Sequence, residues 1–212
     1  MFKLRTVGAA VLTGAAMVSL VGCSGQTKPM DLGYEPDGPG LAQGEVQQVI
    51  EDARQAATEE ESLLRVNDAG EAQTTRMHII VVDRAGQVIG RHSMADAWGG
   101  SVSIAKGKAY TAAAFSSDEN ALTSRSIGAL SQPSGPLWQI GNSNAGPGKP
   151  GLIEFPGGIP LYKDGQLVGA IGVSGDGVEQ DENVAQAGAS SFTAPEPIRV
   201  DTVTSNSVPY TE

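Results

Sequence analysis

The side chains best suited to catalysis or metal binding are scarce in this chain. It holds one cysteine, Cys23, and two histidines, His78 and His92. No serine–histidine–aspartate order stands out, and no cluster of histidines and cysteines has metal-ligand spacing. The sequence therefore identifies no catalytic apparatus. It favours a binding protein over an enzyme and leaves enzymatic activity an open question.

Glycines near the end of an apolar stretch form a second pattern. Gly169, Gly172 and Gly175 follow a G-x-x-G-x-x-G spacing, which differs from the G-x-G-x-x-G of dinucleotide-binding proteins. The strand that carries them also belongs to a hairpin, so we exclude a Rossmann site. The backbone N–H groups of Gly175–Val178, at the head of an expected helix, could hold a carboxylate or simply cap the helix.

The cysteine ends a segment typical of secretion. Two basic residues in Met1–Arg5 precede a short apolar run, Val7–Leu20, and Cys23 follows directly after Gly22. This order predicts a secretory signal over residues 1–22. Its end resembles a bacterial lipobox, which implies a lipidated Cys23 and a protein anchored to a membrane of the cell envelope, on its periplasmic or outer side. The alternative is an ordinary signal peptide with an incidental cysteine.

Composition excludes one class of partner. The formal net charge is −10, so the chain has no electrostatic reason to bind nucleic acid. Only 5% of the residues are aromatic, and we therefore expect a core of Val, Ile, Leu and Ala. The length suits one domain, expected at residues 41–189, with a flexible tether at 23–40 and a disordered tail at 190–212.

Two similar hairpins are the expected centre of the domain. Asp164-Gly165 lies between apolar runs, and it is a strong hairpin signal because both central residues of a type I′ turn need positive φ. Gly169 and Gly172 within a strand indicate that another backbone or a ligand comes very close. The expected strands are Met77–Val82, Gln87–His92, Ile159–Tyr162 and Gln166–Val173.

Helical spacing of apolar residues accounts for much of the rest. The expected helices are Leu41 to about Val66, Val102–Phe115, a short one to about Leu130, and Val178–Ala189. Ser116 and Glu119 have the spacing of a capping box, which places the start of the short helix there. The Gly- and Pro-rich segment Ser131–Gly158 is expected to pack as a lid. These elements predict an α/β (α+β) fold, an antiparallel sheet of two hairpins flanked by helices.

Three segments together carry a family resemblance: VVDRAGQVIGRHSMADA, IAKGKAYTAAAF and FPGGIPLYKDGQLVGAIGVSGDGVEQDENVAQAG. Over about Leu41–Ala189 the chain resembles the GlcG/HbpS-like haem-binding, or "haem-degrading", family. The resemblance implies profilin-like α-β-α layering, homo-oligomers, and haem or iron handling. The chain departs from the common pattern in its longer loop, Gln132–Phe155, and in His92, where members more often carry arginine.

The resemblance also suggests site residues. Haem iron takes an axial donor such as histidine, and we expect His92 to be that ligand, with Arg91 near the haem carboxylates and Met94 close by. His78 is a second metal candidate, although its place on a strand face is more typical of a packed residue. Tyr110 is a weaker donor.

Signature positions of the family add further cofactor-binding candidates. These are Lys108, Gly157, Gly158 and Gly175. Lys108 lies on an alanine-rich helix, and it could instead pair with a buried carboxylate.

The leading hypothesis is an extracytoplasmic, lipid-anchored haem- or iron-binding protein. One alternative is a module that binds a small organic acid or an apolar ligand under the lid. Another is an oligomeric accessory or sensor partner of an envelope protein. Haem degradation follows only from the label of the family.

Overall fold

The computed structural model describes residues 38–143, 151–203 and 208–211. The centre of this part of the chain is an antiparallel four-stranded sheet with the order β4-β3-β6-β5. Its strands are β3 (His78–Asp83), β4 (Val88–Ser93), β5 (Gly158–Lys163) and β6 (Gln166–Ser174). Both predicted hairpins form, and they join through β3 and β6. The signal segment with Cys23 and almost all of the tether lie outside the described residues.

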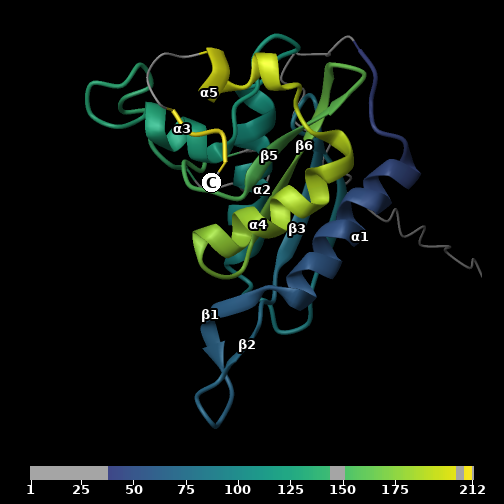
Figure 1. Cartoon of the computed structure of the whole chain (residues 1–212), viewed down its shortest axis with the longest axis vertical. Helices are drawn as coiled ribbons and strands as arrows, with labels where there is room; N and C mark the ends of the chain where they lie inside the picture. Colours follow the sequence, from purple (N-terminus) through teal and green to yellow (C-terminus); the bar gives the residue numbers. More distant parts are fainter. Residues whose placement is uncertain (1–37, 144–150, 204–207, 212) are drawn as a thin grey trace, which may run out of the picture.

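Helices cover both faces of the sheet (Figure 1). One face packs against α1 (Gln43–Glu59) and α4 (Val178–Ala189), and the other against α2 (Ser101–Ala114), with α3 (Ser124–Leu130) beside it. The predicted fold class and its helix–sheet–helix layering are confirmed. Among the described residues, no helix has the length and apolar character needed to cross a membrane.

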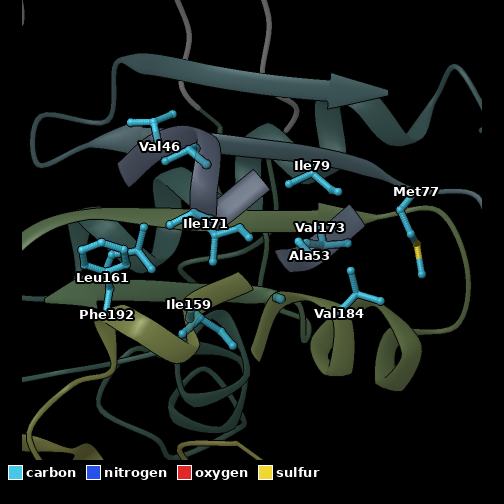
Figure 2. Packing of buried hydrophobic residues seen from close by; sticks show 14 of the residues in the cluster. Val46, Ala53, Met77, Ile79, Ile159, Leu161, Ile171, Val173, Val184 and Phe192 are labelled. Atoms are coloured by element: carbon cyan, nitrogen blue, oxygen red, sulfur yellow. The ribbon is translucent and has the colours of Figure 1, made fainter. Parts of the chain in front are cut away.

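The core is divided between the two faces by the alternation of side chains along each strand. Ile79 and Val81 of β3 join the larger cluster beneath α1 and α4 (Figure 2). Ile80 and Val82 face the other way, against the alanines of α2. The aliphatic core predicted from the composition is therefore present on both sides.

Glycines let β6 approach its neighbours closely. A Cβ at Gly172 would collide with the backbone of Ala105 and Ala109 in α2, and one at Gly169 would collide with the carbonyl of Val82. The close approach predicted from these glycines is confirmed, and the approaching group is the protein's own backbone. Because α2 lies so near the sheet, its alanines fill the space that larger side chains would need.

The first helix ends earlier than predicted. After Glu59 the chain forms β1 (Glu61–Val66), which pairs with β2 (Ala72–Thr74) in a small hairpin that projects from the body (Figure 1). The hydroxyl of Ser62 and the backbone N–H of Leu63 both donate to the carboxylate of Asp176. These contacts with a residue distant in the sequence draw the segment out of the helix.

The short helix also begins later than predicted. Its N-cap is Thr123, whose hydroxyl accepts a hydrogen bond from the backbone N–H of Ser126 at 3.1 Å. The hydroxyl of Ser116 instead bonds both the N–H and the carbonyl of Leu122, closing a turn. The capping-box spacing at Ser116 therefore marked a turn between two helices.

The prediction of a disordered tail is wrong for the described residues 190–203 and 208–211. They form two short 3-10 turns, Ser190–Phe192 and Glu196–Ile198, and the helical turn α5 (Val200–Val203). Val208 and Tyr210 are buried. The hydroxyl of Thr123 donates to the carbonyl of Tyr210 at 2.5 Å. Isolated apolar residues hold this segment, which is why periodicity did not reveal it.

The turn at Asp164-Gly165 allows a direct test of the fold. Both residues have positive φ, 52° and 80°, as predicted. A Cβ at Gly165 would meet no atom within 4 Å, so a substitution acts only through backbone strain. We expect Gly165→Val to lower the free energy of unfolding by about 1–3 kcal/mol in urea titrations. Gly99→Val is the control, because Gly99 is equally uncrowded and lacks positive φ. Equal stability losses in both variants would contradict the assignment of strain to this turn.

Candidate functional site

A buried ion pair joins α2 to α4. The Nζ of Lys108 lies 2.6 Å from Oδ2 of Asp181, and the two side chains are 0% and 3% exposed. Lys108 also donates to the carbonyl of Val173 at 3.0 Å and lies 5.1 Å from the centre of the Phe155 ring. The predicted pairing of Lys108 with a buried carboxylate is confirmed.

The second oxygen of Asp181 is held by the chain itself. The backbone N–H groups of Gly175 and Asp176 donate to its Oδ1 at 2.9 and 3.1 Å. These groups belong to the stretch that the sequence suggested for a carboxylate. The carboxylate they hold is the protein's own, so these two N–H groups are already occupied by Asp181.

Burial and pairing act in opposite directions on the two charges. Burial lowers the pKa of Lys108 and raises the pKa of Asp181, and the charge of each partner opposes the shift. Beside them, Arg125 contacts Glu179 and lies 2.8 Å from Oε2 of Glu182. The acidic start of α4 is therefore part of an ion-pair network, in addition to its favourable place at the positive end of the helix.

The predicted cofactor-binding glycines gather around the same pair. A Cβ at Gly157 would lie 2.9 Å from the Nζ of Lys108. A Cβ at Gly158 would collide with the backbone carbonyl of Lys108, and a Cβ at Gly175 would collide with the backbone carbonyl of Arg76. Protein atoms fill the space that a side chain would need. Close packing thus explains these glycines, and their role in cofactor binding stays a prediction.

His78 is fully engaged inside the protein. It is buried at the start of β3. Its Nδ1 lies 2.8 Å from the hydroxyl of Ser93, and its Nε2 lies 2.8 Å from the carbonyl of Trp98. Both ring nitrogens are therefore in use, which favours the packed-residue interpretation over metal binding.

The structure separates Arg91 from His92. In the register of β3 and β4, His92 lies opposite Ile79, on the face covered by α1, while Arg91 lies opposite Ile80, on the face of α2. Side chains directly opposite each other in a sheet share a face. A ligand on one face of the sheet therefore cannot contact both, and the role of His92 as a haem ligand stays a prediction.

Met94 shares its face with His92 but packs inward. It lies against the larger core cluster, and its sulfur is 3.3 Å from the backbone nitrogen of Met77. Across the described part of the chain, no group of three or more His, Cys, Asp or Glu side chains could hold a metal ion. The predicted site residues thus divide into a buried network around Lys108 and a separate set on β4.

Sequence reasoning missed a groove of about 400 Å³ where α2 ends beside the β3–β4 turn. It is lined by Arg84, Ala85, Gly86, Tyr110, Ala113, Ala114, Ser116 and Leu167. This volume is within the usual range for small-molecule sites. The turn and the helix are far apart in the sequence, so no local pattern marked the groove, although Tyr110 had been noted as a donor.

The groove combines an apolar floor with two polar groups. The ring of Tyr110 packs on Gly86, where a Cβ would lie 2.8 Å from its Cε2. Within the described part of the chain, the hydroxyl of Tyr110 forms no hydrogen bond. Arg84 is half-buried and lies 3.0 Å from Oδ1 of Asp118. A phenol and a guanidinium therefore face an aliphatic surface formed by Ala113, Ala114 and Leu167.

Residues 45–190 match the family described as "Haem degrading protein HbpS-like". The chain belongs to this family. It is 32% identical over 113 residues to an uncharacterized 15.0 kDa protein from the dhaT-dhaS intergenic region of Citrobacter freundii, covering 53% of this chain and 73% of that one. It is also 32% identical over 114 residues to the corrinoid adenosyltransferase PduO of the same organism, covering 54% of this chain and 31% of that one.

A solved structure supports the same relationship. The crystal structure of a PduOC:heme complex aligns with a TM-score of 0.56 and 25% identity, covering 74% of this HbpS-like chain and 98% of the other. The family resemblance noted in the sequence is therefore confirmed.

The buried pair is expected to be essential for stability. Lys108→Met leaves Asp181 as a buried unpaired charge and should lower the free energy of unfolding by about 3–5 kcal/mol. The double variant Lys108→Met/Asp181→Asn should lose less than the sum of the single losses, because it leaves no lone charge. Urea unfolding of Lys108→Met, Asp181→Asn and the double variant measures the three losses.

Lys106→Met is the matched control for this series. Lys106 lies on the same helix, is half-exposed and forms no ion pair with the described residues. Its replacement should change stability by less than about 0.5 kcal/mol. If the losses in free energy of unfolding from the Lys108 and Asp181 substitutions are strictly additive, the two side chains are not coupled.

Proposed function

We propose that this HbpS-like protein binds haem, and that the groove beside Tyr110 is the site. The observation that carries the proposal is the combination, in one groove, of an apolar floor, a guanidinium and a phenol that forms no hydrogen bond with the described residues. The family description and the haem complex of PduOC support the choice of ligand.

The residues of the groove fit the parts of a haem. Tyrosine is one of the axial ligands that proteins use for haem iron, and Tyr110 could supply it. Arginine binds carboxylates through paired hydrogen bonds, so Arg84 could hold a propionate while sharing its charge with Asp118. Ala113, Ala114 and Leu167 offer aliphatic contact to the ring. Haem, when bound, would supply a redox-active iron, and the chain's own residues would bind and orient it.

His92 remains the competing axial ligand. It lies on the face of the sheet covered by α1, away from the groove, and its imidazole is half-buried. His92 is not among the residues that line the groove. The two hypotheses therefore place haem on opposite sides of the sheet, which makes them separable by substitution.

A haemin titration followed by the Soret band tests the proposal. We expect wild type to bind one haem per chain. Tyr110→Phe should shift the band and weaken binding roughly ten- to a thousandfold, since each decade corresponds to about 1.4 kcal/mol. His92→Ala should leave the Soret band and the haem affinity unchanged.

The opposite pattern, in which His92→Ala loses haem affinity and Tyr110→Phe does not, would place the site on the face of the sheet covered by α1. Absence of binding by wild type would remove haem as the ligand of this chain.

We also propose that the protein acts outside the cytoplasm as a lipid-anchored homo-oligomer, in contact with the membrane and with a further envelope protein. The signal-like segment and the lipobox-like Leu20–Cys23 support the anchor.

Large apolar side chains exposed around the projecting hairpin, including Leu63, Val66 and Trp98, support self-association. Sedimentation velocity at micromolar concentration tests the oligomer, and a monomer would contradict it.

Localisation is tested with Cys23→Ala. Without the cysteine, lipidation cannot occur, so the variant should leave the membrane fraction or accumulate as an unprocessed precursor. Cell fractionation and immunoblotting measure both outcomes. A variant that fractionates and migrates like wild type would contradict the lipoprotein assignment.

A further inference from the structure

The groove beside Tyr110 offers an occupant oxygen as its side-chain metal donor. Among its described lining residues, only Tyr110 and Ser116 carry a side-chain atom that can bind a metal ion, and in both that atom is a hydroxyl oxygen. No histidine, methionine or cysteine is among these lining residues. The groove thus differs from haem sites that hold iron through nitrogen or sulfur.

Of the two hydroxyls, the one on Tyr110 is accessible to an occupant. The hydroxyl of Ser116 accepts a hydrogen bond from the N–H of Leu122 and donates to the carbonyl of the same residue, both at 3.0 Å. Tyr110 is half-buried, and its hydroxyl forms no hydrogen bond with the described residues and is not enclosed by them. The phenol oxygen is therefore the side-chain donor that remains for a metal ion in the groove.

The charges around the groove limit which metal ion this oxygen can hold. Tyrosine binds a metal ion as the phenolate, so the bond brings a negative charge to a partly apolar surface. Arg84 is the one basic side chain among the described lining residues, and its Nη1 lies 3.0 Å from Oδ1 of Asp118, which offsets its charge. The phenolate therefore has to be balanced by the metal ion itself.

A porphyrin with a trivalent metal ion supplies that balance. The trivalent ion leaves a single positive charge at the centre of the porphyrin, and the phenolate cancels this charge. A divalent ion leaves the centre neutral, so the phenolate would add an uncompensated charge, which is costly away from water. Phenolate is also a hard oxygen donor, whereas imidazole suits divalent iron and zinc. Charge and donor type both favour the trivalent ion.

We propose that Tyr110 makes the groove selective for ferric over ferrous haem, and for trivalent over divalent metal porphyrins in general. The inference rests on the proposed function and names the oxidation state of its ligand. Arg84 and the aliphatic residues of the groove would contact the propionates and the ring, which are the same in both forms. Tyr110 is then the residue that determines this specificity.

Redox-inert analogues separate the charge of the metal ion from the rest of the ligand. Gallium(III) and zinc(II) protoporphyrin IX share ring and propionates, and both fluoresce, so each can be titrated with the full chain. We expect wild type to bind the gallium porphyrin more tightly by a factor of at least about ten. Tyr110→Phe should bind both with the affinity that wild type has for the zinc porphyrin. It should also melt at the wild-type temperature, because the lost hydroxyl forms no hydrogen bond with the described residues.

Tyr110→His is the converse variant. A neutral imidazole adds no charge and suits divalent ions, so this variant should bind the zinc porphyrin at least as tightly as the gallium porphyrin. Tyr162→Phe is the matched control, and it should keep the wild-type preference for gallium. The hydroxyl of Tyr162 donates to the carbonyls of Ser117 and Asn120, at 2.7 and 3.1 Å, and Tyr162 does not line the groove.

Two outcomes would overturn the inference: equal affinity of wild type for the two porphyrins, or a preference for gallium that persists in Tyr110→Phe. Haemin titration of the same variants distinguishes this failure from a failure of the proposed function. Haemin binding that depends on Tyr110 keeps the groove as the haem site, even if the gallium preference is absent. Haemin binding that is independent of Tyr110, or no haemin binding, removes the groove as the haem site and the selectivity with it.

Discussion

The ion pair between Lys108 and Asp181 holds the two helical layers together. Lys108 extends from α2 on one face of the sheet, and Asp181 begins α4 on the other, so their contact at 2.6 Å connects both faces past the end of the strands. The pair is acceptable in the interior because each charge has further partners: a carbonyl and an aromatic ring for the ammonium, and two backbone N–H groups for the carboxylate. Gly157 is one consequence, since a side chain there would meet the Nζ of Lys108 and the Cβ of Asp181.

Close packing of α2 on the sheet then determines where a ligand can bind. Gly172 and the alanines of α2 leave no space between helix and sheet along most of their length. The loop after α3 closes the outer side, because Ile153 packs on Gly107 and its N–H donates to the hydroxyl of Thr111 at 2.9 Å. A groove opens where α2 ends, beside Arg84 and Gly86. The open groove thus lies at the end of the layer that the ion pair fixes.

The strand register matters as much for function as for folding. His92 and Arg91 are neighbours in the sequence and suggest a shared site, yet successive residues of a strand point to opposite faces. The same alternation places His78 with Ser93 on the side of α2, where both ring nitrogens find protein partners. The C-terminal segment shows the converse: Arg199 and Tyr210 are distant in the sequence, and the fold brings the guanidinium over the ring.

The sequence by itself determined the elements whose signals are local. The hairpin turn at Asp164-Gly165, the alanine-rich α2 and the bounds of α4 follow from residue types and short spacings. The sequence also suggested a carboxylate partner for Lys108, but the fold decided that this partner is Asp181, which is distant in the chain. Only the tertiary structure decided the end of α1, where Asp176 draws Ser62 into a strand, the order of the C-terminal segment, and the groove beside Tyr110. The physical reason is common to these cases: each depends on contacts between residues far apart in the chain, which leave no periodic pattern in the sequence.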